Sequence, residues 1–380
     1  MNRLILIGNG FDLAHGLNTS YNDFIKWYMN RFYVKALKEP YKDVLLEIVR
    51  NSKYNNNHLT ESNVNYWVQR SYETGFNNIL LLGDPYPDYY DHRVKIYPFT
   101  ANLKSELLNQ LLFKCLAGRW VDIESIFYEQ LKIILNGKSN DETKEILLKV
   151  LNDSLRCIVT QLEQYLVSLP EPSKNERYVE IFTSMIKIYD LHLNKMEKQL
   201  LALKKDQYPK HTYILNFNYT NTIEKYVTAE ALKPPNKFAI NYIHGKLKDE
   251  LTPMIFGFGD ELDEAYIKME REQAKGYFEH IKSFWYFRNS RYKDLVRFTD
   301  NDLYQVCIIG HSCGLSDRTM LNMIFEHKNC KSIKIYYHGD DNASNYTDLT
   351  YDISRHFKDK AEMRNKIVSL DCSESMPQVI

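Results

Sequence analysis

The first twelve residues, MNRLILIGNGFD (residues 1–12), carry the clearest signal of the fold. The apolar run Leu4–Ile7 leads directly into Gly8-Asn9-Gly10. A short, continuously apolar run is typical of a strand that is buried on both faces of a parallel sheet. A glycine turn directly behind such a strand is typical of the first βα unit of a doubly wound sheet. We therefore predict an α/β fold that is built on a mostly parallel sheet.

The rest of the chain divides into two parts by periodicity. Apolar residues return at helical spacing from about residue 21 onward and again within 101–117, 121–136, 141–168 and 175–204. Strand-like runs return only near residue 212, and the candidates are Thr212–Asn216, Ala239–Ile243, Met254–Gly257, Gln305–Ile309 and Ser332–Tyr337. We predict a sheet domain made of residues 1–20 plus 206–380, with an all-helical insertion over 21–205. Such an insertion would leave the sheet beside the glycine turn and could cover a ligand there.

Composition narrows the class of protein. The 380 residues include 49 basic and 49 acidic side chains, so no broad electrostatic attraction to nucleic acid is expected. The N-terminus has no signal-peptide pattern, and no apolar run approaches the ~20 residues that span a bilayer. The six cysteines form no C-x-x-C pair, which disfavours a zinc ribbon. We expect a cytoplasmic protein with reduced cysteines, no membrane partner and no bound metal.

The turn Gly8-Asn9-Gly10 suits a phosphate, because glycine lets the backbone approach an anion closely. A plain strand-to-helix turn is the alternative. The dehydrogenase pattern G-x-G-x-x-G would need glycine at position 13, where the chain has Leu13, so an NAD-dependent dehydrogenase is disfavoured. We place six residues of this turn at a nucleotide: Gly8, Asn9, Gly10, Phe11, Asp12 and His15. Three of them, Asn9, Asp12 and His15, could instead cap the first helix or order the turn.

Two polar motifs follow predicted strands. The motif at 216–222 contains Asn218, whose amide could bind a ribose hydroxyl, a carboxamide or a water molecule. His244 lies in Ile243-His244-Gly245 and could act as a general base. The carboxyl ends of parallel strands are where open α/β sheets bind ligands. We predict Asn218 and His244 as the catalytic residues; a turn residue and a structural histidine are the alternatives.

Two further motifs are less specific. Gly310 and Ser312 begin the segment 310–317 after an apolar strand, and small residues with free N–H and hydroxyl groups can form a second phosphate-binding turn. Asp317 in the same segment is a good N-cap for a helix over Met320–Phe325. Within Trp120-Val121-Asp122-Ile123-Glu124, the acids Asp122 and Glu124 could face the site or could be favourable acids in a helix first turn.

Together these motifs resemble the bacteriophage abortive-infection AbiH family. The opening signature of that family is similar to residues 7–24, and further similarity covers 120–124, 216–220, 243–245 and 257–260. The family in turn resembles sirtuin-like NAD-binding proteins, in which a Gly-x-Gly turn is followed six residues later by glycine, as Gly10 is by Gly16 here. That likeness implies a Rossmann-like, sirtuin-like fold. It matches Asn218 to the functional asparagine, His244 to the base, and Gly310 and Ser312 to the phosphate turn.

The resemblance also implies an activity. The zinc-binding cysteine pairs of sirtuin deacylases are missing, which argues against protein deacylation. The sirtuin-like effectors of bacterial antiphage defence hydrolyse NAD, and the same is implied here, with NAD or NADP as the substrate. No tightly held cofactor is expected. This chain has Thr220 where the pattern has an aspartate, which weakens the assignment of whatever that acid does.

Three functions therefore stay open at this stage. The first is an antiphage NAD(P) glycohydrolase, in which infection supplies a phage-derived trigger and copies of the chain could associate. The second is a non-catalytic nucleotide sensor in phage defence. The third is a metal-dependent hydrolase or nuclease that uses Asp12, Asp122 and Glu124. The sequence shows no strong metal-ligand spacing, so the third function ranks last.

Overall fold

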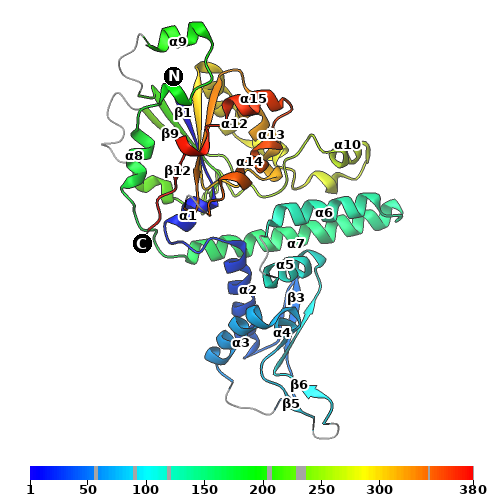
Figure 1. Ribbon diagram of the computed structural model, residues 1–380. Helices are drawn as coiled ribbons and strands as arrows, with labels where there is room; N and C mark the ends of the chain where they lie inside the picture. The colour runs from blue at the N-terminus through cyan, green and yellow to red at the C-terminus, as the bar shows by residue number, and fades with distance from the viewer. Residues whose placement is uncertain are drawn as a thin grey trace. The chain divides into compact units, whose positions relative to one another are not determined.

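The computed structural model divides the chain into two compact units (Figure 1). The first unit comprises Met1–Thr19, Leu169–Glu270 and Ile281–Ile380, and the second comprises Ser20–Ser168 and Arg271–His280. The structure describes residues 1–54, 59–88, 92–117, 121–202, 208–227, 237–340 and 343–379.

A six-stranded sheet forms the centre of the first unit, and all of its strand pairs are parallel. Its strands are β1 (Asn2–Ile7), β8 (His211–Asn216), β9 (Lys237–Tyr242), β10 (Tyr304–Ile309), β11 (Cys330–Tyr337) and β12 (Glu374–Ser375). The spatial order is β12-β11-β10-β1-β8-β9. Counted along the chain and read from β9, this is the order 3-2-1-4-5-6 of doubly wound sheets. The predicted parallel α/β sheet is confirmed.

Strand β1 lies in the middle of this sheet because its side chains are apolar on both faces. Leu4 and Leu6 pack into one core, and Ile5 and Ile7 pack into the other. All four are fully buried. Complete burial of such a side chain contributes roughly 1.5–3 kcal/mol, so the continuous apolar run selects a central strand with a layer on each face.

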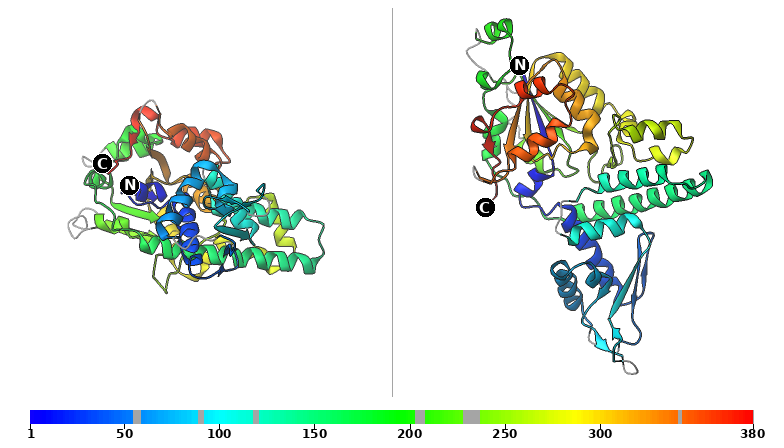
Figure 2. Two further views of the ribbon diagram at one scale, coloured as in Figure 1. Left: turned by 90° about the horizontal axis from the view of Figure 1, so that it is seen from below. Right: turned by 45° about the vertical axis from the view of Figure 1, so that its right-hand side comes forward.

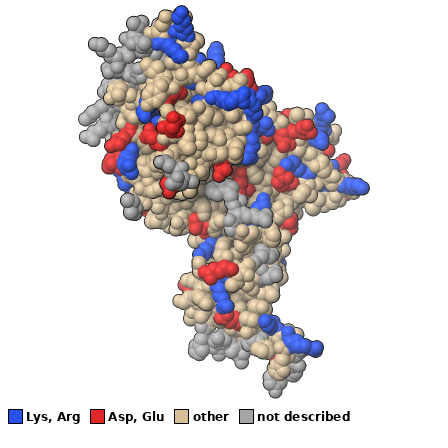
Figure 3. All heavy atoms as spheres, in the orientation of Figure 1, with Lys and Arg blue, Asp and Glu red and all other residues tan. Residues whose placement is uncertain are grey.

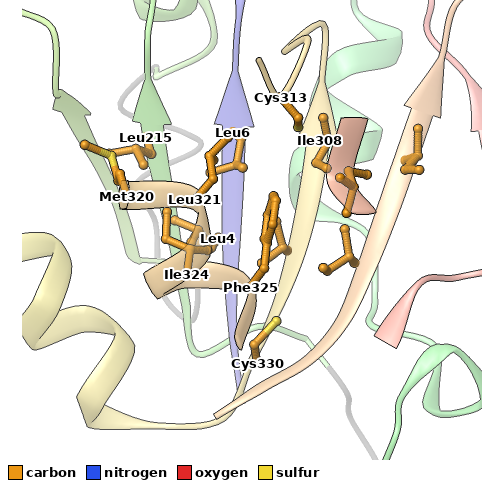
Figure 4. Packing of buried hydrophobic residues seen from close by; sticks show 14 of the residues in the cluster. Leu4, Leu6, Leu215, Ile308, Cys313, Met320, Leu321, Ile324, Phe325 and Cys330 are labelled. Atoms are coloured by element: carbon orange, nitrogen blue, oxygen red, sulfur yellow. The ribbon is translucent and has the colours of Figure 1, made fainter. Parts of the chain in front are cut away.

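Helices cover both faces. On one face α12 (Arg291–Asn301), α13 (Arg318–Glu326) and α14 (Tyr346–Ser354) contribute to the first core, and Figure 4 shows Leu321, Ile324 and Phe325 against Leu4 and Leu6. On the other face α1 (Asn9–Ala14), α8 (Arg177–Thr183) and the 3₁₀ helix η2 (Thr222–Tyr226) contribute to the second core. The orange and red C-terminal helices lie beside the sheet in both Figure 1 and the right-hand view of Figure 2.

Four of the five predicted strands are confirmed as β8, β9, β10 and β11. The prediction of a strand at Met254–Gly257 is wrong. Gly257 has a φ of 153°, and only Phe258 makes an isolated bridge, to Ile281. The Ile255 amide donates to the His244 carbonyl (2.7 Å), so this apolar run folds back as a loop instead of entering the sheet.

We predicted that the insertion extends to residue 205, but the first unit already resumes at Leu169. Tyr178 and Phe182 of α8 are buried in the same core as Ile5, Phe11 and Ile214. Helical periodicity continues through this segment, so the sequence pattern does not mark the change of partner. The proline-containing break at 170–172 marks it instead, within two residues or so of the division at Leu169.

The second unit is not all-helical, and that prediction is wrong. Its main helices are α2 (Tyr21–Ala36), α3 (Glu61–Thr74), α5 (Glu106–Leu116), α6 (Ile123–Asn136) and α7 (Asp141–Ser168). A four-stranded antiparallel sheet adds β2 (Tyr41–Lys42), β3 (Leu46–Arg50), β7 (Phe99–Leu103) and β4 (Leu81–Leu82), in the order β2-β3-β7-β4. Leu46 and Ile48 alternate with more exposed residues, and so do Phe99 and Ala101. That alternation with a period of two is short enough to be masked by the surrounding helical pattern.

The remaining elements are short. They are α4 (Phe76–Leu80), β5 (Tyr86–Pro87), β6 (Lys95–Ile96), α9 (Lys195–Ala202), α10 (Glu264–Arg271), α11 (Lys282–Trp285), α15 (Lys360–Lys366) and the 3₁₀ helices η1 (Ile188–Asp190), η3 (Lys275–Phe278), η4 (Tyr286–Arg288), η5 (Leu315–Asp317) and η6 (Leu370–Cys372). Over the described ranges, no helix is both long and apolar enough to cross a membrane. Basic and acidic side chains are interspersed on the face shown in Figure 3.

Candidate active site

Four polar segments meet at the carboxyl edge of the parallel sheet. They follow β1, β8, β9 and β10, which are neighbours in the sheet. The order of the strands reverses between β1 and β10, and crevices at such a reversal are where open α/β sheets bind ligands. The predicted motifs at 8–12, 216–222, 243–245 and 310–317 therefore all lie at the edge where a ligand is expected.

The two glycine turns pack directly against each other. The Gly10 amide donates to the Gly310 carbonyl (2.8 Å), and the Gly8 amide donates to the Ile309 carbonyl (3.2 Å). Gly310 has a φ of +68°, and a Cβ at this position would lie 2.2 Å from the Phe11 nitrogen. These glycines are thus required by the contact between two loops. Because the Gly8 and Gly10 amides already donate within the protein, a phosphate here would need other donors.

The contact between the glycine turns gives a test of stability. Replacing Gly310 by alanine is expected to lower the free energy of unfolding by about 1–3 kcal/mol, because the left-handed backbone and the clash with Phe11 both oppose a side chain. Gly314 in the same loop is the matched control. It has a φ of −67°, and an added Cβ would meet nothing closer than 3.6 Å. Urea titrations in which both variants lose the same stability would contradict this explanation.

Three more of the residues that we predicted at the nucleotide, Ser312, Asn9 and Phe11, differ in exposure. Ser312 is exposed, and Asn9 is half-buried as the first residue of α1. Phe11 is fully buried in the aromatic core, and its amide donates to the Gly8 carbonyl (2.9 Å). The structure thus leaves Ser312 and Asn9 accessible to solvent, while the Phe11 side chain packs in the core next to the turn.

Asp12 is the most deeply buried acid of this edge. Its Oδ2 accepts a hydrogen bond from the Thr220 hydroxyl (2.6 Å), and the Thr222 hydroxyl donates to Thr220 (3.3 Å). The Asn218 side-chain amide donates to the Gly8 carbonyl (3.0 Å) and so joins the segment after β8 to the turn after β1. Burial raises the pKa of Asp12 to about 6, although the polar side chains of Thr220, Thr222 and Asn218 oppose the rise. A carboxyl group therefore contacts Thr220, the residue that departs from the sirtuin-like pattern.

His15 belongs to an aromatic cluster. Its two ring nitrogens lie 2.6 Å from the Phe11 carbonyl and 2.5 Å from the Tyr226 hydroxyl, and its ring stacks on Tyr178 with centroids 4.9 Å apart. Burial lowers the pKa of His15. These contacts fit the alternative role of ordering the turn.

His244 lies in a second network, with Asp317 and Lys282. Its Nε2 is 3.1 Å from Asp317 Oδ1 and 3.2 Å from the Tyr286 hydroxyl. The Lys282 ammonium donates to the same Asp317 oxygen (2.9 Å), and all three charged or titratable side chains are buried. Burial and the Lys282 charge lower the pKa of His244, while Asp317 opposes them. Burial by itself would raise the pKa of Asp317, but Lys282 and His244 outweigh it and hold that pKa well below the usual value.

His311 lies beside this network. Its Nε2 is 3.7 Å from Asp317 Oδ2, and its Nδ1 accepts a hydrogen bond from the Cys313 amide (2.9 Å). Burial lowers the pKa of His311 to about 4, so the ring is neutral near pH 7. The phenyl ring of Phe217 contacts both histidines, with centroids 5.1 Å from His244 and 4.1 Å from His311. Asp317 and Lys282 thus carry the formal charges of the network.

Sequence reasoning missed two members of this network and assigned another a different role. Asp317 does occupy the N-cap position of α13, but its side chain makes no capping hydrogen bond. The carboxylate instead binds Lys282 and His244. Lys282 and Tyr286 carry no motif that could have identified them, because a lone lysine and a tyrosine in an aromatic segment are usually surface or core residues.

The remaining motifs have local structural roles. The Asp122 side chain caps α6 by accepting from the Glu124 and Ser125 amides (3.0 and 3.3 Å), and Trp120 lies outside the described residues. Asp260 of the 257–260 motif pairs with Arg318 (3.0 Å). In the described part of the chain, no group of three or more His, Cys, Asp or Glu side chains could hold a metal ion.

The fold and the site define a parallel α/β protein whose buried polar residues collect at the carboxyl edge of its sheet. The chain belongs to the bacteriophage abortive infection AbiH family, whose model matches residues 4–338. The match spans most of both units and confirms the resemblance seen in the motifs. No curated protein and no solved structure matches the chain.

Proposed function

We propose that this chain is an abortive-infection effector that binds NAD or NADP and hydrolyses the bond between nicotinamide and ribose. The observation that carries the proposal is a pair of hydrogen bonds, from Asn218 to Gly8 and from Thr220 to Asp12, which join the segment after β8 to the turn after β1. That turn lies at the carboxyl end of β1, where the order of a Rossmann-like 3-2-1-4-5-6 sheet reverses toward β10. Doubly wound sheets of this strand order bind dinucleotides at such a reversal.

The hydrolysis of this bond needs few protein groups. Water attacks ribose C1′ as the C1′–N bond breaks through an oxocarbenium-like state, and the bonding electron pair leaves with nicotinamide. Nicotinamide departs as a neutral molecule, so no general acid is needed. The site must orient the ribose or the water and must supply a base for the water or for a ribose hydroxyl. Asn218 and His244 can serve these ends, since they follow the adjacent strands β8 and β9.

Nicotinamide release from NAD tests the proposal. We expect Asn218→Ala and His244→Ala each to lower the rate by about 10²-fold, the lower end of what general-base and positioning groups contribute. Asn221→Ala and His338→Ala are matched controls, because both of those side chains are exposed, and they should retain the wild-type rate. NADP in a parallel assay decides between the two dinucleotides.

A second candidate, a non-catalytic nucleotide sensor, is favoured by the way in which His244 is held. Its ring faces Asp317, Tyr286 and the Phe217 backbone, so a base there would first have to leave an existing hydrogen bond. Saturable NAD binding without nicotinamide release, with and without a lysate of phage-infected cells as a source of trigger, would favour the sensor. The absence of both NAD binding and nicotinamide release would overturn the NAD assignment.

A further inference from the structure

Asp12 has a carboxylate oxygen that the fold leaves unused. Only 1% of the residue is exposed, and Oδ2 is held by the Thr220 hydroxyl at 2.6 Å. Oδ1 is buried and has no hydrogen-bond partner. A buried polar atom without a partner costs about 1–3 kcal/mol, so native proteins keep few of them unless a water molecule or a ligand completes the site.

The surroundings of Asp12 decide which of its oxygens can act on a ligand. Thr222 supports Thr220, and Thr220 in turn fixes the carboxyl through Oδ2. Oδ1 is the remaining acceptor of the carboxyl group. Asn218, two residues before Thr220, donates to the Gly8 carbonyl, so the segment that holds Asp12 is also joined to the glycine turn. An acceptor of this kind takes a hydroxyl or water donor rather than a phosphate, because a phosphate would repel the carboxylate.

We propose that Asp12 is the catalytic base that takes the proton from the attacking water, an inference that rests on the proposed hydrolysis of NAD. In this step the water oxygen bonds to ribose C1′, the C1′–N bond breaks, and its electron pair leaves with neutral nicotinamide. The water proton moves to Oδ1 of Asp12. His244 is left to the other task named above, the ribose hydroxyl.

Both the geometry and the acidity of Asp12 suit this role better than those of His244. The Asp12 oxygen needs to break no existing hydrogen bond, whereas His244 Nε2 faces Asp317 and Tyr286. Burial raises the pKa of Asp12 to about 6, which is close to the value at which a general base works best near neutral pH.

The test is the pH dependence of kcat/KM for nicotinamide release between pH 4.5 and 8. Wild-type activity should rise with pH through about 6 as Asp12 loses its proton. Asp12→Asn should lower kcat by about 10²–10⁴-fold and leave KM nearly unchanged. Asp348→Asn, at an exposed aspartate, should change neither.

Two outcomes separate the inference from the function. A wild type that releases nicotinamide together with an Asp12→Asn variant that keeps more than a tenth of the rate would overturn the role of Asp12 alone. A wild type that releases none would overturn both. Should Asp12→Asn fail to fold, Thr220→Val replaces it: the Thr220 hydrogen bond lowers the pKa of Asp12, so its loss should move the rise in activity to higher pH, and an unmoved profile would overturn the inference.

Discussion

Replacing Lys282 by methionine is expected to lower the free energy of unfolding at pH 7 by about 3–5 kcal/mol, the usual cost of breaking a buried ion pair from one side. Lys282 has no exposed surface, and its ammonium lies 2.9 Å from Asp317 Oδ1. Methionine fills much of the same volume but leaves the buried Asp317 carboxylate without its cation. Urea unfolding followed by circular dichroism measures the loss.

The double variant Lys282→Met/Asp317→Asn separates the charge effect from packing. It removes both charges and should recover most of the lost stability, since replacing a whole buried pair is often close to neutral. Arg297→Met is the control at an exposed pair with Asp294, where the change should stay within about 1 kcal/mol. If the double variant is no more stable than Lys282→Met, then lost packing rather than an unpaired charge explains the effect.

Asp12→Asn is expected to raise the free energy of unfolding by about 3 kcal/mol at pH 7, the equivalent of lowering a pKa from about 6 to 3.8. The sign follows from the direction of the shift. Because the folded-state pKa is raised, the stability contributed by Asp12 is complete below about pH 3.8 and is lost as the pH rises through about 6. Asparagine keeps an oxygen for the Thr220 hydroxyl but carries no charge to desolvate.

The gain in stability should therefore depend on pH. Urea titrations at several values between pH 4.5 and 8 should show the advantage of Asp12→Asn growing up to about pH 7 and then levelling. Asp348→Asn should give a difference that does not follow this curve. An advantage that is the same at every pH would mean that the Asp12 charge is not what costs stability. A variant that is more stable and less active is the usual signature of a functional residue kept at a cost to the fold.

The parallel sheet and its polar edge could be predicted because their signals are local. The apolar run Leu4–Ile7 needs a layer on each face wherever it is placed, and asparagine, histidine and glycine behind the strands mark where their carboxyl ends lie. The antiparallel sheet of the second unit was missed for a local reason as well. Strands β3 and β7 have five residues each, and so few positions cannot outweigh the helical pattern around them.

The buried central strand, the glycine turn behind it and the motifs of the AbiH family can all be read from the amino-acid order alone. The partners of the charged residues, in contrast, follow from three-dimensional packing. Thr220 meets Asp12 across 208 residues of chain, and Lys282 meets Asp317 across 35. Burial turns those pairings into a raised pKa at Asp12 and a lowered one at Asp317. Desolvation and Coulomb energy depend on which side chains the fold encloses together, and no spacing along the chain records that.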